Sequence, residues 1–256
     1  MRRLLILGYG SLSYLFFFGV FVYAIGFVGG VAVPKTIDSG ATSPLGETLL
    51  VNTLLLSLFA VQHSGMARRR FKQALTRFVP AAMERPTYVL ATSAALALLF
   101  WQWRPLPDVI WTVESNLRAA AYGVYLTGWA VVLLSTLMIH HFDLFGLRQA
   151  WLGFRGVDYT PLGFRTPGLY RYMRHPIQAG FLMAFWAAPT MTVGHLMFSI
   201  VTTAYIIVVV KFFEEPDLLR EFGARYREYM SQVSGFLPLK RYRRSAETPA
   251  MAASGD

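Results

Sequence analysis

The sequence contains no cysteine among its 256 residues. Disulfide bonds, thiolate metal ligands and a cysteine nucleophile are therefore excluded. If the protein performs sulfur chemistry, the sulfur must arrive with a bound molecule.

Charged residues are also scarce, at 15% of the chain against 55% hydrophobic residues. This composition is too apolar for an ordinary soluble domain and is typical of an integral membrane protein. Acidic residues are the rarest, with 14 Asp and Glu against 24 Lys and Arg, which gives a formal net charge of +10. Because the basic residues gather in short segments between apolar runs, they indicate a positive-inside bias and attraction to anionic membrane lipids, rather than nucleic-acid binding.

A dinucleotide-binding fingerprint is missing as well. Gly8-Tyr9-Gly10 is not followed by a third glycine and does not follow a strand. A soluble Rossmann-type enzyme is therefore excluded.

Apolar runs recur along the chain, and several reach the roughly 17–25 residues that a membrane-spanning helix needs. They cover residues 4–33, 48–61 with a polar end at 62–64, 88–103, 117–139, and 177–213 with an interruption at 189–195. These runs predict an all-α, polytopic membrane bundle of about five to six transmembrane helices, in which the last two form a hairpin with a tight outer turn. The basic segments after the second and fourth runs predict that both chain termini are cytoplasmic. The absence of an outer-membrane strand pattern favours a bacterial inner or plasma membrane.

Beyond the hairpin the pattern becomes amphipathic. Phe222, Tyr226 and Tyr229 are spaced three and four residues apart, which predicts a cytoplasmic amphipathic helix that Gly235 and Pro238 end. Residues 241–256 are small and polar and predict a disordered tail. With no internal repeat, residues 1–240 are predicted to form a single membrane domain.

Two polar clusters adjoin the hairpin. Arg171, Arg174 and His175 precede its first helix, whose first turn tolerates Pro176, and Glu214 and Glu215 end its second helix. The hairpin therefore brings arginines, a histidine and two carboxylates to one face of the membrane. Carboxylates beside an apolar run are costly unless they are paired or bind a ligand. We expect one to pair with an arginine and the other to contact a ligand cation; the alternative is that both form ion pairs with Arg171 or Arg174.

Other histidines are weaker indicators. His140 and His141 with Asp143 suggest a metal site, but adjacent helical histidines point about 100° apart and rarely bind one ion together, so no metal is predicted. His63, between Gln62 and Ser64, marks a polar helix end that faces a cavity near the other clusters.

Three C-terminal segments, Gly168–Pro176, Glu214–Leu219 and Phe222–Tyr229, resemble the core of the membrane methyltransferases that include isoprenylcysteine carboxyl methyltransferases and phospholipid methyltransferases. Two upstream segments, Gln62–Arg68 and His140–Gln149, are similar to bacterial methanethiol S-methyltransferases, which make dimethyl sulfide. The likeness covers most of residues 48–238, with the catalytic core at about 118–238. Gln178 departs from the pattern, since many relatives have Tyr there.

The resemblance implies S-adenosylmethionine-dependent methylation of a small thiol, methanethiol, at the cytoplasmic face. It assigns cofactor binding to Gly168, Leu169, Tyr170, Arg171, Arg174, His175, Glu214, Glu215 and Tyr226. Arg171 or Arg174 would hold the cofactor carboxylate, and a Glu its ammonium or ribose hydroxyls. Alkyl thiols are mostly protonated at neutral pH, so a base is useful. The candidates are His141 and His63, with His175 third, and the matching segment adds Asp143 and Arg148 as catalytic candidates.

Three alternatives remain open at this point. A related enzyme would methylate a prenylcysteine carboxylate or a lipid amine. A membrane reductase would require a nicotinamide in place of S-adenosylmethionine. A non-enzymatic membrane carrier would explain the apolar runs without using the polar clusters.

Overall fold

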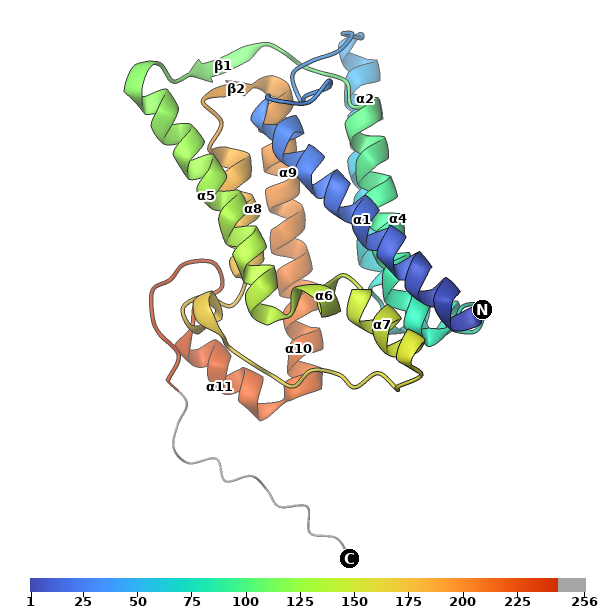
Figure 1. Cartoon of the computed structure of the whole chain (residues 1–256). Coiled ribbons are helices and arrows are strands. Elements are labelled where there is room, and N and C mark those ends of the chain that lie inside the picture. Colours follow the sequence, from blue (N-terminus) through green and yellow to red (C-terminus); the bar gives the residue numbers. More distant parts are fainter. Residues whose placement is uncertain (244–256) are drawn as a thin grey trace, which may run out of the picture.

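Helices form nearly all the regular structure of residues 1–243, the part of the chain that the computed structural model describes (Figure 1). The bundle contains α1 (Arg2–Gly29), α2 (Leu45–Met66), α4 (Ala81–Gln102), α5 (Ser115–Ile139), α8 (Pro176–Trp186) and α9 (Val193–Val209). The predicted all-α membrane bundle is confirmed. Of the predicted disordered tail, all but residues 241–243 lies outside the described residues.

Four helical segments in this region are long and apolar enough to cross a membrane. They are α1, α2, α5 and the continuous helix Val193–Phe222. By contrast, α8 has 11 residues. At a rise of about 1.5 Å per residue it is roughly 17 Å long, which is shorter than a hydrocarbon core of about 30 Å.

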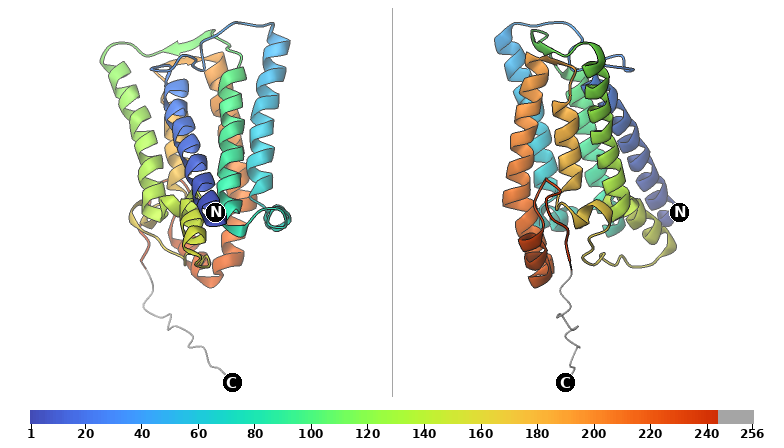
Figure 2. Two further views of the ribbon diagram at one scale, coloured as in Figure 1. Left: turned by 45° about the vertical axis from the view of Figure 1, so that its right-hand side comes forward. Right: turned by 90° about the vertical axis from the view of Figure 1, so that its left-hand side faces the viewer.

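The shorter helices gather at the end of the bundle that carries the N-terminus, which we call the site end (Figures 1 and 2). They are α3 (Arg69–Leu75), α6 (His141–Leu144), α7 (Leu147–Arg155), the 3₁₀ turn η1 (Gly168–Arg171), the π-helical turn η2 (Val210–Glu214), α10 (Glu215–Phe222) and α11 (Ala224–Gln232). The opposite end, the far end, carries an antiparallel ribbon of β1 (Val109–Thr112) and β2 (Thr190–Thr192).

Several boundaries differ from the sequence-based expectations for local reasons. The first span ends at Gly29 rather than near Val33, because Gly30 adopts a left-handed conformation (φ 69°) and its N–H caps the carbonyl of Gly26. The third span begins at Ala81, seven residues before the predicted start, and includes Pro86. The predicted turn between the last two helices contains β2, paired with β1 in the loop before α5.

The C-terminal amphipathic helix was also predicted as one piece, and this is wrong. The chain turns sharply at Gly223, whose φ of +56° interrupts the helix between α10 and α11. Such a φ is readily available only to glycine. As a result, α11 folds back beside η1 and the start of α8, where Arg174 N–H and His175 N–H bond the carbonyls of Ser234 and Gly235.

Helices α5 and α8 approach each other closely at two glycines. A Cβ on Gly180 would lie 2.6 Å from the carbonyl oxygen of Gly128, and one on Gly128 would lie 2.7 Å from the carbonyl oxygen of Gly180. Small residues allow this backbone approach between helices in a membrane. Toward the far end, Phe27, Trp103 and Phe198 belong to a buried apolar core. Together these contacts fix α8, and with it His175 at its N-terminus.

Candidate functional site

Glu214 and Glu215 lie where α9 passes through the π turn η2 into α10. Pro216 lacks an N–H and its ring would crowd the carbonyl four residues earlier, so a regular α-helix is disfavoured here. The turn widens instead, and the N–H of Glu215 bonds the carbonyl of Val210. π turns of this kind are frequent at functional sites. In this geometry both carboxylates reach His175: Glu214 Oε1 is 3.4 Å from Nδ1, and Glu215 Oε1 is 3.1 Å from Nε2.

Glu215 is the carboxylate that pairs with an arginine. Its Oε1 lies 2.7 Å from one terminal nitrogen of Arg174 and 2.8 Å from Nε, and both side chains are 15% exposed. The other terminal nitrogen of Arg174 donates to the backbone carbonyls of Met230 and Val233. Arg174 therefore ties α8, α10 and α11 together, and its donors are engaged within the protein.

Glu214 has a different environment, with a side chain that is 36% exposed. Gln178 Nε2 donates to its Oε2 at 2.8 Å. Gln178 lies one turn beyond His175 on α8, so the two residues hold the carboxylate from neighbouring positions. No arginine or lysine forms an ion pair with Glu214 among residues 1–243. This carboxylate is thus oriented by neutral or titratable partners and remains open to a ligand cation.

His175 is buried, at 1% exposed, between the two carboxylates. Burial by itself lowers the pKa of the imidazole, but the hydrogen bonds and charges of Glu214 and Glu215 outweigh it and raise the pKa above its ordinary value. The site therefore favours the imidazolium form. A protonated His175 positions the two carboxylates and is a poor candidate for a base.

Tyrosines complete this cluster. Tyr226 is 2% exposed, and its buried hydroxyl has no hydrogen-bond partner in the described structure. Burial, followed by the charge of Glu215, raises the pKa of Tyr226; burial, followed by the charge of Glu214, raises that of Tyr170. Both phenols therefore remain hydrogen-bond donors at neutral pH. Tyr229 differs, because its hydroxyl already donates to the backbone carbonyl of Tyr170.

The segment before α8 approaches the end of α5 closely. Gly168 has φ +51°, and a Cβ there would lie 2.4 Å from Met138 Sδ. The N–H of Leu169 lies 3.4 Å from the same sulfur. Arg171 is exposed, and none of the ion pairs found among residues 1–243 includes it. Its backbone carbonyl accepts from Tyr242 N–H at 2.7 Å, so the guanidinium remains available to an anionic group.

His141 and His140 point in different directions. His140 takes a left-handed conformation (φ 105°) between α5 and α6, is exposed and lies 3.1 Å from Arg165. His141 is buried, with Nε2 2.8 Å from the hydroxyl of Tyr14 and Nδ1 2.8 Å from that of Thr136. Burial lowers the pKa of His141, so the ring is neutral at neutral pH.

Asp143 and Arg148 form an ion pair with each other at 2.7 Å. Arg148 also donates to the carbonyl of Thr160 at 3.1 Å, and Tyr159 donates to Asp143 at 3.2 Å. These contacts fasten the loop after α7 to the start of the α6–α7 segment. Asp143 and Arg148 therefore neutralise each other, and both take part in contacts that hold this loop in place.

His63 lies near the site end of α2. The Tyr88 hydroxyl is 3.0 Å from Nδ1 and 3.1 Å from Nε2, and Thr92 Oγ1 is 3.4 Å from Nδ1. Phe59 stacks on the ring with centroids 5.2 Å apart. One hydroxyl serves both nitrogens, so Nε2 is the freer of the two.

The predicted site residues therefore fall into three groups at the site end. Residues 168–178, the two glutamates and Tyr226 form one connected cluster, which we call the carboxylate cluster. His141 with its partners and His63 with its partners form two others. Arg85 links these two, because it donates to the carbonyl of Leu144 at 2.7 Å and lies over the ring of Tyr88. The ion pair Arg68–Asp217, at 3.1 Å, links the end of α2 to α10.

Sequence reasoning missed the residues that hold the histidines, namely Tyr14, Thr136, Tyr88 and Thr92. Each is a single polar side chain on an apolar helix. The one sequence signal that could have identified them is that hydroxyl side chains within membrane helices often form hydrogen bonds with polar groups of neighbouring helices. Gln178 was noticed as a departure from a pattern, without its role beside Glu214.

The carboxylate cluster offers an open carboxylate, an unpartnered phenol and an exposed guanidinium at the edge of an apolar bundle. Such a set suits a ligand that carries a cation, hydroxyls and a carboxylate. Within residues 1–243, no group of three or more His, Asp or Glu side chains is arranged to hold a metal ion.

Comparison with known proteins shows similarity over nearly the whole chain. The phospholipid methyltransferase family matches residues 118–225. Methanethiol S-methyltransferase of Mycobacterium tuberculosis is 54% identical, over 93% of this chain and 98% of that protein. Methanethiol S-methyltransferase 2 of Bradyrhizobium diazoefficiens is 52% identical over 92% and 91%, and the enzyme of Crocosphaera subtropica is 46% identical over 93% of each chain. No solved structure matches.

Proposed function

This chain belongs to the methanethiol S-methyltransferase family and is a methyltransferase, and we propose that it transfers a methyl group from S-adenosylmethionine to methanethiol. The sulfur–methyl bond of the donor breaks, a new carbon–sulfur bond forms, and the thiol proton is released. The products are dimethyl sulfide, S-adenosylhomocysteine and a proton. The observation that carries the donor assignment is the open carboxylate of Glu214 beside the unpartnered hydroxyl of Tyr226.

The carboxylate cluster fits the polar groups of S-adenosylmethionine. Glu214 would accept hydrogen bonds from the ammonium or the ribose hydroxyls. The Tyr226 hydroxyl, which has no partner within the described protein, would form a hydrogen bond with the bound donor molecule. Arg171, rather than the engaged Arg174, would hold the carboxylate. Glu215, Arg174 and His175 would act as the frame that positions Glu214.

When bound, the sulfonium would supply an electrophilic methyl group. The residues around it have two tasks, which are to align the thiol sulfur behind that methyl and to exclude water. Charge disappears as a thiolate and a sulfonium react, so an apolar bundle next to a charged rim suits the reaction. The S–H is the only polar group of methanethiol, so the apolar interior of the bundle needs no further polar side chain to bind it.

The thiol proton needs an acceptor, and the geometry favours His63. Its Nε2 shares one hydroxyl with Nδ1, whereas each nitrogen of His141 has a hydroxyl of its own. His141 would then act as a positioning residue that joins α1 to α5. In this assignment His63→Asn lowers the rate most near neutral pH, where the thiol is protonated and the imidazole can accept its proton, and the loss diminishes as the pH approaches the thiol pKa. An unchanged pH–rate profile for His63→Asn, or the same change for His141→Asn, contradicts it.

We place the site end in the cytoplasm, where the donor is made, in a bacterial inner or plasma membrane. The basic segments around α3 and between α7 and α8 belong to this end, in line with the positive-inside rule. We further propose that residues 1–240 act as a single domain.

Headspace gas chromatography of purified protein with S-adenosylmethionine and methanethiol tests the proposal. Dimethyl sulfide from the wild type, and much less from Glu214→Ala, is the expected result. No dimethyl sulfide despite measurable donor binding rejects methanethiol as the acceptor, and a prenylcysteine or lipid amine is then tested. Failure to bind the donor rejects the methyltransferase mechanism.

A further inference from the structure

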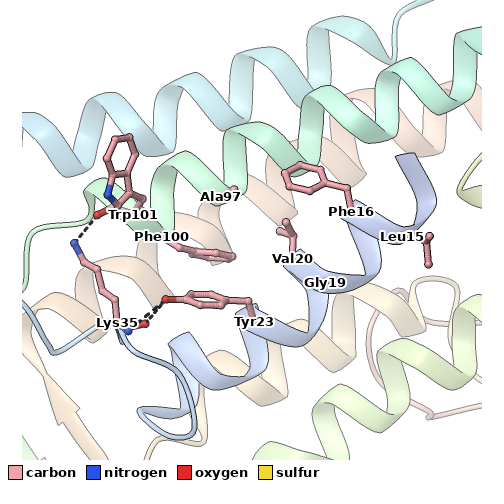
Figure 3. A pocket seen from close by; sticks show the side chains of 9 residues that line it. All are labelled: Leu15, Phe16, Gly19, Val20, Tyr23, Lys35, Ala97, Phe100 and Trp101. Atoms are coloured by element: carbon pink, nitrogen blue, oxygen red, sulfur yellow. Dashed lines mark hydrogen bonds between the residues drawn. The ribbon is translucent and has the colours of Figure 1, made fainter. Parts of the chain in front are cut away.

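An apolar groove runs along the outside of the bundle between α1 and α4, away from the carboxylate cluster (Figure 3). Its volume is about 400 Å³, and its lining includes Leu15, Phe16, Gly19, Val20 and Phe100. This volume lies within the range of roughly 300–1,000 Å³ seen for ligand sites. Leu15 is 62% exposed and Phe16 is 41% exposed, so the groove opens sideways, toward the lipid that surrounds a membrane-spanning helix.

Gly19 creates much of this space. A Cβ at Gly19 would meet no atom within 4 Å, whereas one at Gly10, nine residues nearer the site end, would lie 2.3 Å from Cβ of Ala150. Helix α1 therefore packs tightly against α7 toward the site end, whereas the space beside Gly19, along the groove, is not filled by protein atoms. A flexible hydrocarbon chain fits such a channel, since it needs no polar partner there.

The groove ends in a cation at the far end of the bundle. Lys35 lines this end, and its ammonium donates to the carbonyl of Trp101 at 2.6 Å. An ammonium has three donors, so two remain for a ligand. The nearby Asp38 is engaged elsewhere, as acceptor from the hydroxyl of Thr192.

A second cation lies beside the first. Burial, followed by the charge of Arg104, lowers the pKa of Lys35. Asn52 clamps the backbone of Arg104 from both sides, at 2.9 and 2.8 Å. The Arg104 Nε is buried without a hydrogen-bond partner, and the ion pairs found among residues 1–243 include neither cation. Two like charges and an unsatisfied donor are costly together, and an anion between them removes both costs.

We propose that the groove between α1 and α4 binds an anionic phospholipid, with one acyl chain along Gly19 and the phosphate at Lys35 and Arg104. The apolar channel ends at Lys35, and Arg104 follows three residues after Trp101, which also lines the groove. One molecule fits both the channel and the cations only if it carries a hydrocarbon chain and a negative charge. The site belongs to the far end, so its lipid is bound from the leaflet opposite the carboxylate cluster.

Native mass spectrometry of the delipidated full-length protein tests this. The titrants are dioleoylphosphatidylglycerol and dioleoylphosphatidylcholine, which have the same chains and differ in net charge. Phosphatidylglycerol should bind about tenfold more tightly, because both lipids offer the same phosphate but only phosphatidylcholine adds a trimethylammonium group, which the positive charges of Lys35 and Arg104 repel. Gly19→Phe, which fills the groove, and Lys35→Gln, which keeps the donor to Trp101 but removes the charge, should each weaken it about tenfold.

Gly8→Phe is the matched control, because a Cβ at Gly8 also meets nothing within 4 Å but lies outside the groove. It should leave phosphatidylglycerol binding unchanged. If Gly19→Phe does not fold, Gly19→Leu gives the same comparison with a smaller side chain. Equal affinity for the two lipids, equal effects at Gly8 and Gly19, or complete displacement by glycerol 3-phosphate alone would each overturn the proposal.

Discussion

Glu214 and Glu215 are neighbours in the chain, yet the same substitution should affect different properties of the protein. Glu215→Gln removes the charge that faces Arg174, whose side chain is only 15% exposed. Breaking a buried ion pair by changing one partner costs about 3 kcal/mol. At roughly 2–4 °C per kcal/mol for a protein of this size, Tm should fall by about 6–12 °C.

Glu214→Gln should lower Tm by less than Glu215→Gln does, because this carboxylate is more exposed and contacts His175 and Gln178 but no arginine. Its loss should appear in donor binding. One charge-assisted hydrogen bond at the lower end of its range is worth about 1.5 kcal/mol, so the Kd for S-adenosylmethionine should rise about tenfold. Differential scanning fluorimetry in detergent measures Tm, and isothermal titration calorimetry measures Kd. Equal losses of Tm in the two variants, or a loss of Tm confined to Glu214→Gln, would refute the division of roles.

Three further predictions concern packing, an unpaired hydroxyl and pH. Gly128→Ala should cost about 1–3 kcal/mol, because its Cβ would meet backbone atoms of α8 at 2.7 Å, whereas Gly123→Ala, in open space on the same helix, should keep Tm. Tyr226→Phe should keep or raise Tm while weakening donor binding several-fold; Tyr229→Phe, which loses a bond to a carbonyl, should lower Tm by calorimetry. The raised pKa of His175 contributes stability that is complete below pH 6.5 and is lost as pH rises through the folded-state pKa. Tm measured across this range should therefore fall, and should fall less in His175→Asn; a parallel curve for the variant contradicts the assignment.

The helical runs were predictable because length and apolarity are local properties of the sequence. The position of His175 was predictable for the same reason, since Pro176 marks the first turn of α8. Which carboxylate would face Arg174 was not predictable. That choice depends on the wider turn at residues 210–214, which changes the rotation of every residue after it.

Two other features escaped sequence reasoning because they depend on tertiary contacts. Helix α7 lies in the basic segment after the fourth apolar run, where no helix was predicted, yet its Ala150 packs directly against Gly10 of α1. The break at Gly223 lies inside a regular aromatic spacing, and only its positive φ ends the helix. A glycine within a periodic pattern does not by itself show whether the helix continues.

The unbroken rod from Val193 to Phe222 makes the two ends of the molecule mechanically dependent. Its far end is anchored next to the ribbon, and Glu214 lies about 32 Å along it at 1.5 Å per residue, so a tilt of about 5° displaces this carboxylate by about 3 Å. That displacement equals the whole length of the bond to Gln178, which is 2.8 Å. Helices tilt to match the thickness of the bilayer, so we expect membrane thickness to affect the position of Glu214 relative to Gln178. Turnover in vesicles of graded acyl-chain length should pass through a maximum, and a rate independent of chain length would contradict this expectation.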